Sequence, residues 1–263
     1  NKNRSLNNFI KLYLFIIIIS TNSEYRRIES NMSSINDNKT YELNKEENIV
    51  ELFWDNDIYS CGCLFARCDN IIEINFTNFT TSKVRNMEHM FLVCKQLSSL
   101  NLSCFDTSLV TNMYGMFAGC NSLTSLNLSN FNTSLVKNME ELFCKCYSLI
   151  SLDVSNFNTS QVTNLAAMFH ACAKLTSLNI INFNTSKVEQ MHNMFSKCFL
   201  LTSLNLANFN TSKVTSMQNM FFGCSSLTSL NLSNFNTSSV TSMSNMFDGC
   251  SSLTSLNLSN FNT

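Results

Sequence analysis

The chain has 263 residues and a formal net charge of −1, with 17 Lys and Arg residues against 18 Asp and Glu residues. This balance provides neither the basic surface that nucleic acid needs nor an acidic tail, so nucleic acid is excluded as an expected partner. The sequence contains no Pro and only 5 Gly.

The N-terminal segment predicts export. Lys2, Arg4 and Lys11 precede a short apolar run at residues 12–19. A basic stretch followed by a short apolar one is typical of a secretory signal peptide, and this run is too short to span a bilayer. We predict a signal peptide over residues 1–21, with an uncleaved anchor or an untargeted N-terminus as alternatives. Residues 22–48 are polar and aperiodic, which favours a linker.

The rest of the chain repeats with a period of 26 residues. One column holds Cys68, Cys94, Cys120, Cys146, Cys172, Cys198, Cys224 and Cys250. Such strict spacing predicts a solenoid, because each coil must place the same side chain over the one before it. We expect residues 49–70 to form a degenerate capping coil and residues 71–263 to form the solenoid. The chain stops in the middle of a repeat, so we expect the solenoid to be truncated at its C-terminus.

One unit, residues 227–252, predicts the structure of each coil. Its LxxLxL segment alternates with period two, which indicates a short strand. The Asn-Thr-Ser triplet at 236–238 favours a turn or a helix N-cap. Apolar residues over 240–250 then follow the spacing of one helix face. The expected fold is an α/β repeat solenoid with one short parallel strand and one short helix per coil. Because Gly249 is replaced by Val93 and Lys145 in other units, we expect ordinary helix or turn backbone at that position.

The motif FxxCxxLxxLxL, as at residues 247–258, resembles the leucine-rich repeats of BspA-like surface proteins. The full unit is similar to repeats of bacterial surface lipoproteins and mycoplasma surface proteins, over about residues 49–263. The resemblance implies a leucine-rich-repeat solenoid in a secreted or cell-surface setting. It also implies adhesion or protein binding, with neither catalytic residues nor a cofactor.

The cysteines and histidines predict no reactive centre. Metal sites need clustered ligands, whereas each unit contributes one column Cys on its apolar face, where a thiol packs as a small hydrophobe. Disulfides between coils are the alternative for that column. Off the column, Cys61 and Cys63 are expected to be free thiols, with a local disulfide or a metal site including Cys68 as alternatives. The three histidines fall at different outward positions of the unit, so their columns imply no Ser–His–Asp or Cys–His grouping. They are His89, His170 and His192.

The outward positions of the predicted strands are small, polar and nearly invariant between units. This candidate ligand face comprises Asn101, Ser125, Asn127, Asp153, Ser177, Asn179, Ser203, Asn205, Ser229 and Asn231. In one interpretation these side chains form hydrogen-bonded ladders between coils and bind nothing. In the other they form a flat face for a repetitive ligand, such as a glycan or another copy of the protein. Phe199, Leu200 and Phe222 form a second candidate, an exposed apolar patch.

These observations predict a non-enzymatic, secreted or cell-surface repeat protein that acts in adhesion or protein–protein interaction. Its expected partner is a protein or glycan on another cell or host surface, and a membrane only through an N-terminal anchor or one beyond the C-terminus. One alternative is a carbohydrate- or ice-binding module that uses the Asn/Ser face. Another is an intracellular scaffold.

Overall fold

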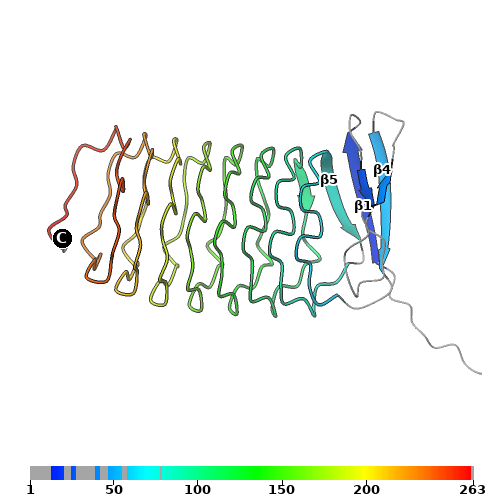
Figure 1. Ribbon diagram of the computed structural model, residues 1–263, viewed down its shortest axis with the longest axis horizontal. Coiled ribbons are helices and arrows are strands. Elements are labelled where there is room, and N and C mark those ends of the chain that lie inside the picture. The colour runs from blue at the N-terminus through cyan, green and yellow to red at the C-terminus, as the bar shows by residue number, and fades with distance from the viewer. Residues whose placement is uncertain are drawn as a thin grey trace, which may run out of the picture.

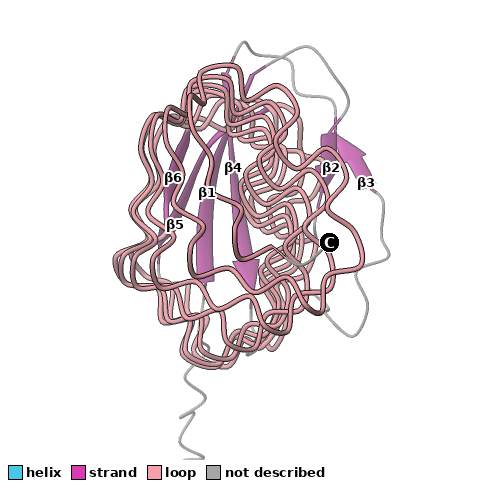
Figure 2. Cartoon of the chain, turned by 90° about the vertical axis from the view of Figure 1, so that its left-hand side faces the viewer, coloured by secondary structure: helices cyan, strands magenta, loops and turns pink. Residues whose placement is uncertain are grey.

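The computed structural model describes residues 13–20, 25–27, 39–41, 47–54, 58–77 and 79–261, with side chains described over 58–76 and 79–261. The coils stack one after another in chain order and form an elongated rod (Figure 1). Seen along the rod, successive coils superimpose closely (Figure 2), as the 26-residue register requires. The prediction of a repeat solenoid is confirmed.

Regular strands lie at the N-terminal end of the rod. They are β1 (Tyr13–Ser20), β2 (Tyr25–Arg27), β3 (Lys39–Tyr41), β4 (Glu47–Trp54), β5 (Ile71–Thr77) and β6 (Ser99–Asn101). One sheet has the order β4-β1-β5-β6, in which β1 is antiparallel to both neighbours and β5 is parallel to β6. The pair β2 and β3 forms a second, antiparallel sheet.

The predicted strand in every coil is found only in part. Ile74 pairs with Leu100, one repeat further on, but the equivalent segments of the later described coils form no regular strand. They keep the parallel register, as the bridge between Ser203 and Ser229 shows. Isolated backbone hydrogen bonds, such as that from Ile150 N to Thr124 O at 3.0 Å, join some of these segments. These isolated bonds occur between some pairs of coils only, so they do not build a full ladder.

The predicted N-terminal elements fall largely outside the described residues. Within the predicted signal peptide the structure describes residues 13–20, as strand β1, and within the predicted linker mainly β2 and β3. The signal peptide and linker therefore stay predictions. Most of residues 49–70 is described, as the end of β4 and a coil that bonds to the next one, but its capping role also stays a prediction. Over the part of the chain that is described, helices with the length and apolarity to cross a membrane are absent.

The predicted short helix in each coil is wrong, because the residues described over 58–261 contain no helix. Alternate N–H groups instead donate to the next coil: Glu141 N lies 2.9 Å from Ala166 O, and Phe143 N lies 2.9 Å from Met168 O. The intervening Leu142 N bonds to Met139 O, three residues back, at 3.3 Å. Donors committed to the next coil cannot make the i→i−4 bonds of a helix. The apolar spacing of three and four residues is produced here by successive tight turns.

Two positions in each coil have left-handed backbone, which corrects the expectation for the Gly249 column. Gly249 has φ +75°, and Val93 and Lys145 in the same column both have φ +59°. A second column, which runs from Cys63 to Asn245, has φ between +53° and +58°. A left-handed residue with a side chain costs about 1–2 kcal/mol. The bonds between coils impose this geometry whether or not the residue is Gly.

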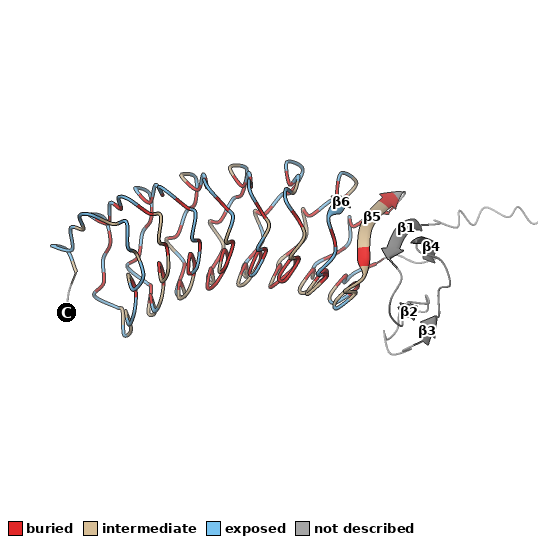
Figure 3. Cartoon of the chain, turned by 90° about the horizontal axis from the view of Figure 1, so that it is seen from above, coloured by how far each residue is buried: buried red, intermediate tan, exposed pale blue. Residues whose placement is uncertain are grey.

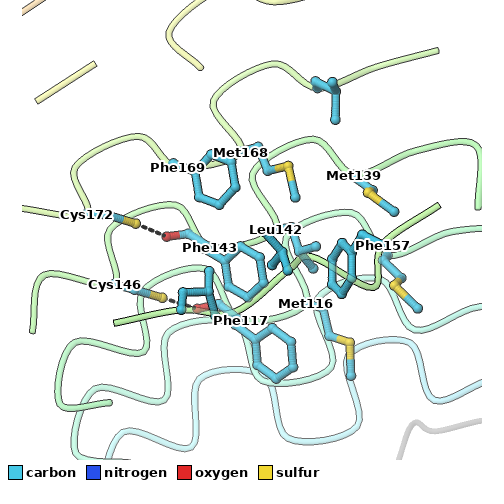
Figure 4. Close-up of a cluster of buried hydrophobic side chains, with 14 of the residues drawn as sticks. Met116, Phe117, Met139, Leu142, Phe143, Cys146, Phe157, Met168, Phe169 and Cys172 are labelled. Carbon is cyan, nitrogen blue, oxygen red and sulfur yellow. Dashed lines mark hydrogen bonds between the residues drawn. The ribbon is translucent and has the colours of Figure 1, made fainter. Parts of the chain in front are cut away.

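Buried residues recur at equivalent places in successive coils along the rod (Figure 3), so the core is a set of side-chain columns. Phe117 and Phe143 stack with their centroids 5.7 Å apart and their planes 3° apart, and neighbouring coils repeat the arrangement. Beside them, the column cysteines from Cys94 to Cys250 donate their thiols to a Phe carbonyl of the preceding coil, as Cys146 does to Phe117 O at 3.2 Å (Figure 4).

The packing role predicted for the column cysteines is confirmed from Cys94 to Cys224, all of which are buried, and every described Cys is free. Burial raises the pKa of Cys146, which neighbouring Cys144 raises further, to about 12. Burial likewise raises the pKa of Cys198 to about 12. Neutral thiols at these positions act as weak hydrogen-bond donors inside the core.

A buried column of threonines joins the coils at the corner after each strand segment. Thr133 Oγ1 donates to Asn158 O at 3.0 Å and accepts from Asn158 N at 2.8 Å. Two residues before Asn158, Asn156 Nδ2 donates to Leu128 O and Phe131 O, both at 3.0 Å. The Asn-Thr-Ser triplet is therefore both a turn and the hydrogen-bonding link between coils.

Candidate ligand-binding face

The ten residues of the candidate ligand face are all exposed and lie in equivalent positions of successive coils. In one coil, Ser125 and Asn127 are exposed, whereas Leu123 and Leu128 are buried. Neighbouring strand segments lie ~4.8 Å apart, so equivalent side chains form rows along the rod. The structure thus brings the predicted residues onto one surface.

The asparagines of this face are held in a single orientation. Asn127 Oδ1 accepts the backbone N–H of Ser129 at 3.1 Å, and Asn205 Oδ1 accepts that of Ala207 at 3.1 Å. Only the oxygen of an amide can accept these bonds, so each Nδ2 is left to point away from the turn. Equivalent bonds hold Asn101, Asn179 and Asn231. Among the described residues these Nδ2 groups donate to no protein atom, so the face presents a row of N–H donors.

This geometry corrects the ladder interpretation for the face. Its asparagines bond within their own coil, and the hydroxyls of Ser125, Ser177, Ser203 and Ser229 bond to no other protein atom among the described residues. The ladders between coils are formed instead by the Asn column that includes Asn156 and by the buried threonines. The groups of the face are therefore available to a ligand.

Asp153 interrupts the row of amides with a carboxylate. Its Oδ1 accepts the N–H of Ser155 at 2.9 Å, so it keeps the turn that Asn makes elsewhere. Hydrogen bonds from the side chain and backbone of Ser155 hold the pKa of Asp153 below its usual range. The face is thus donor-rich and carries no charge apart from the carboxylate of Asp153.

Large apolar side chains border the face on two coils. Ile150 is 51% exposed in a column that is Thr in most other coils, and Tyr147 is 42% exposed three residues before it. Phe199 and Leu200 are exposed as predicted, whereas Phe222 is half-buried. The sequence analysis missed Tyr147 and Ile150. For Ile150 the available signal was its departure from a column that is Ser or Thr in most coils, whereas the column of Tyr147 varies from coil to coil.

All three histidines are half-buried, which corrects the expectation that they face outward. His89 packs against Tyr114 with the ring centroids 4.4 Å apart. His170 is half-buried rather than outward, and its Nδ1 is buried without a hydrogen-bond partner. Burial, and then the positive charges of Lys197 and Lys145, lower the pKa of His170. Over the part of the chain that is described, no three His, Cys, Asp or Glu side chains form a group that could hold a metal ion.

Comparison with protein families decides where this repeat belongs. The family described as "Mycoplasma protein of unknown function, DUF285" matches residues 59–178, 126–205 and 198–263. The chain belongs to the DUF285 family. Its matched segments together extend over the coils that carry the candidate ligand face.

Among solved structures, that of a leucine-rich repeat protein from Bacteroides ovatus is similar to this chain, with 17% sequence identity and a TM-score of 0.33. That match covers 90% of this chain and 82% of the other. No curated protein matches the sequence.

Proposed function

We propose that this protein is a non-enzymatic, secreted or cell-surface repeat protein that binds another protein and so serves in adhesion. The carrying observation is the exposed row of outward N–H donors along the candidate ligand face. Because the turn fixes each Nδ2, a ligand that binds there loses little side-chain entropy from the protein. Its complement is a surface rich in carbonyl or carboxylate acceptors.

A protein partner is favoured because apolar anchors accompany the donors. Ile150 and Tyr147 stand in the same coil as Asp153, and all three side chains are exposed. Exposed apolar groups rimmed by polar ones mark protein-binding surfaces, and Tyr is enriched among residues that dominate binding energy. The similarity of the repeat to BspA-like surface proteins supports the same function and setting.

Two other functions follow from the same face. A glycan would use the regular amide and hydroxyl rows without needing Ile150, and ice would be a further repetitive ligand. An intracellular scaffold would use the face equally well but would not need the predicted signal peptide. Antibody labelling of intact and permeabilised cells distinguishes the settings, because a surface protein is labelled on intact cells.

The binding test uses beads coated with the 263-residue chain and monolayers of cultured epithelial cells. Trypsin treatment of the monolayer should abolish adhesion if the partner is a protein, whereas periodate oxidation should abolish it if the partner is a glycan. Adhesion that survives trypsin and is lost after periodate would replace the proposal with the glycan alternative. A chain that adheres to neither treated nor untreated cells would contradict an adhesion function on these cells.

Matched variants locate the contact. Asn127→Asp with Asn205→Asp keeps the turn, as Asp153 shows, but replaces two donors with carboxylates. The control makes the same change at Asn210, whose Oδ1 accepts the N–H of Ser212 at 3.0 Å, away from the face. Asp106 already occupies the equivalent position in another coil. We expect roughly a 10-fold loss of adhesion for the face variant and little change for the control.

A second pair of variants tests the apolar anchor. Ile150→Thr installs the residue that most other coils carry in this column, so the coil should fold normally. Leu135→Gln, which matches Gln161 in its own column, removes an exposed apolar side chain away from the face. Adhesion should fall for the first variant only. Equal effects of both variants would indicate nonspecific hydrophobic adhesion.

A further inference from the structure

A pocket opens on the turn side of the coils, separate from the candidate ligand face. Its volume is about 420 Å³, within the range of small-molecule sites. The lining is Leu92, Val93, Ala118, Gly119, Glu141, Cys144, Lys145, Ala167, His170 and Asn193. The hollow arises because small residues replace larger ones within a column. Ala118 stands where the preceding coil has Leu92 and a later coil has Phe222.

The pocket carries two opposite charges that do not pair with each other. Over the described residues, the Glu141 carboxylate and the Lys145 ammonium make no ion pair and no hydrogen bond. Both lie near the Cys144 thiol between them. Burial raises the pKa of that thiol to about 12, Glu141 raises it further and Lys145 lowers it. The thiol is therefore neutral, and the formal charges of the pocket are those of one anion and one cation.

The remaining lining separates into apolar and polar parts. Leu92, Val93 and Ala118 supply an apolar wall, whereas Asn193 and the half-buried His170 supply polar groups. Because burial and nearby Lys197 and Lys145 lower the pKa of His170, its ring is neutral near pH 7 and adds no further charge. A ligand that complements this lining carries one cationic group, one anionic group and an apolar part.

We propose that this pocket binds a small zwitterion of the free amino acid or short peptide class, with an apolar side chain. The ligand ammonium pairs with Glu141, its carboxylate pairs with Lys145, and its side chain packs against Leu92 and Val93. Such paired, charge-assisted bonds are among the stronger polar contacts in proteins. This site is independent of the adhesive face, so either proposal can fail without the other.

The experiment is isothermal titration calorimetry of the full chain with L-leucine and with the dipeptide Leu-Leu. Two further probes remove one charge each: N-acetyl-L-leucine lacks the ammonium, and L-leucinamide lacks the carboxylate. We expect at least one zwitterion to bind and each single-charge probe to bind roughly 10-fold more weakly or not at all. Whichever of leucine and Leu-Leu binds more tightly then shows whether the pocket takes a free amino acid or a dipeptide. Equal binding of the charged and blocked probes would overturn the proposal, as would no binding of either zwitterion at millimolar concentration.

Variants taken from the protein's own columns locate the site. Ala118→Leu fills the pocket with the residue found at position 92, and Ala66→Leu makes the same change in the same column outside the pocket. Lys145→Gln removes the pocket cation, and Lys197→Gln is its control in the same column. Binding should be lost with Ala118→Leu, fall about 10-fold with Lys145→Gln, and persist in both controls. Unchanged binding in Ala118→Leu or Lys145→Gln would overturn the assignment, and circular dichroism verifies that each variant is folded.

Discussion

Replacing a left-handed lysine with glycine should stabilise the rod. Lys197 is exposed and has φ +61°, and its N–H donates to Phe222 O at 2.6 Å. Left-handed geometry costs a residue with a Cβ about 1–2 kcal/mol, whereas Gly adopts it freely. Gly also makes the unfolded chain more flexible, which lowers stability by about 0.5–1 kcal/mol. The balance for Lys197→Gly is a gain of about 0.5–1 kcal/mol.

The control is Lys174→Gly, at an exposed position whose φ is not positive. This variant gains flexibility in the unfolded chain without relief of backbone strain, so it should lose about 0.5–1 kcal/mol. The unfolded-state effect is common to both variants, and their difference of about 1–2 kcal/mol isolates the left-handed cost. In thermal unfolding the two midpoints should differ by about 2–8 °C.

The assay is thermal and urea unfolding of both variants, followed by circular dichroism. A shift in midpoint at unchanged m-value reports stability rather than a change in compactness. If Lys197→Gly lost as much stability as Lys174→Gly, the left-handed geometry of this column would not be a feature of the folded protein.

Four further outcomes are expected. Phe143→Ala should destabilise the chain by about 3–5 kcal/mol in urea unfolding, because it opens a gap in the Phe stack, and a loss below about 1 kcal/mol would contradict the stacked core. Thr133→Val leaves Asn158 N–H without its acceptor and should lose about 1–3 kcal/mol, whereas Thr133→Ser should recover most of it. Above pH about 9 the Cys198 thiol ionises in the unfolded chain, whereas in the folded protein burial raises its pKa to about 12 and keeps it neutral. Its contribution to the free energy of unfolding therefore falls by about 1 kcal/mol for each pH unit between pH about 9 and pH about 12. Cys198→Ala should therefore flatten the alkaline unfolding profile, and an unchanged profile would contradict the assignment. In the native state Ellman's reagent should modify Cys63, the one thiol classed as exposed among the described residues, far faster than Cys198.

The candidate ligand face was accessible to sequence reasoning because its rows follow from the repeat. Once each coil superimposes on the last, residues 26 apart must align, so the period alone predicts that Asn127 and Asn205 share one surface. The orientation of their amides was not predictable in the same way. It depends on a bond to the backbone N–H two residues later, which periodicity does not report. Ile150 was missed because it interrupts a regular column of Thr, and Tyr147 because its column has no regular pattern.

The pocket could not be predicted from the sequence, for a related reason. Its lining comes from coils between Leu92 and Asn193, and its shape depends on how far each neighbouring side chain projects. Sequence columns show that Ala118 is small but not whether adjacent residues close the gap. The missing ion pair between Glu141 and Lys145 is likewise a matter of side-chain placement.

The amino-acid sequence was sufficient for the 26-residue stack, the apolar columns of Phe and Cys and the exposed rows of Asn and Ser, because a fixed period forces equivalent residues into register. It was not sufficient for the backbone of the turn side, where apolar spacing of three and four residues suggested a helix. Helix and stacked turns place Met139, Leu142 and Phe143 on the same inner face, so periodicity cannot separate them. The choice between them is made by the neighbouring coil, whose carbonyls take the N–H groups of Glu141 and Phe143 that a helix would use internally.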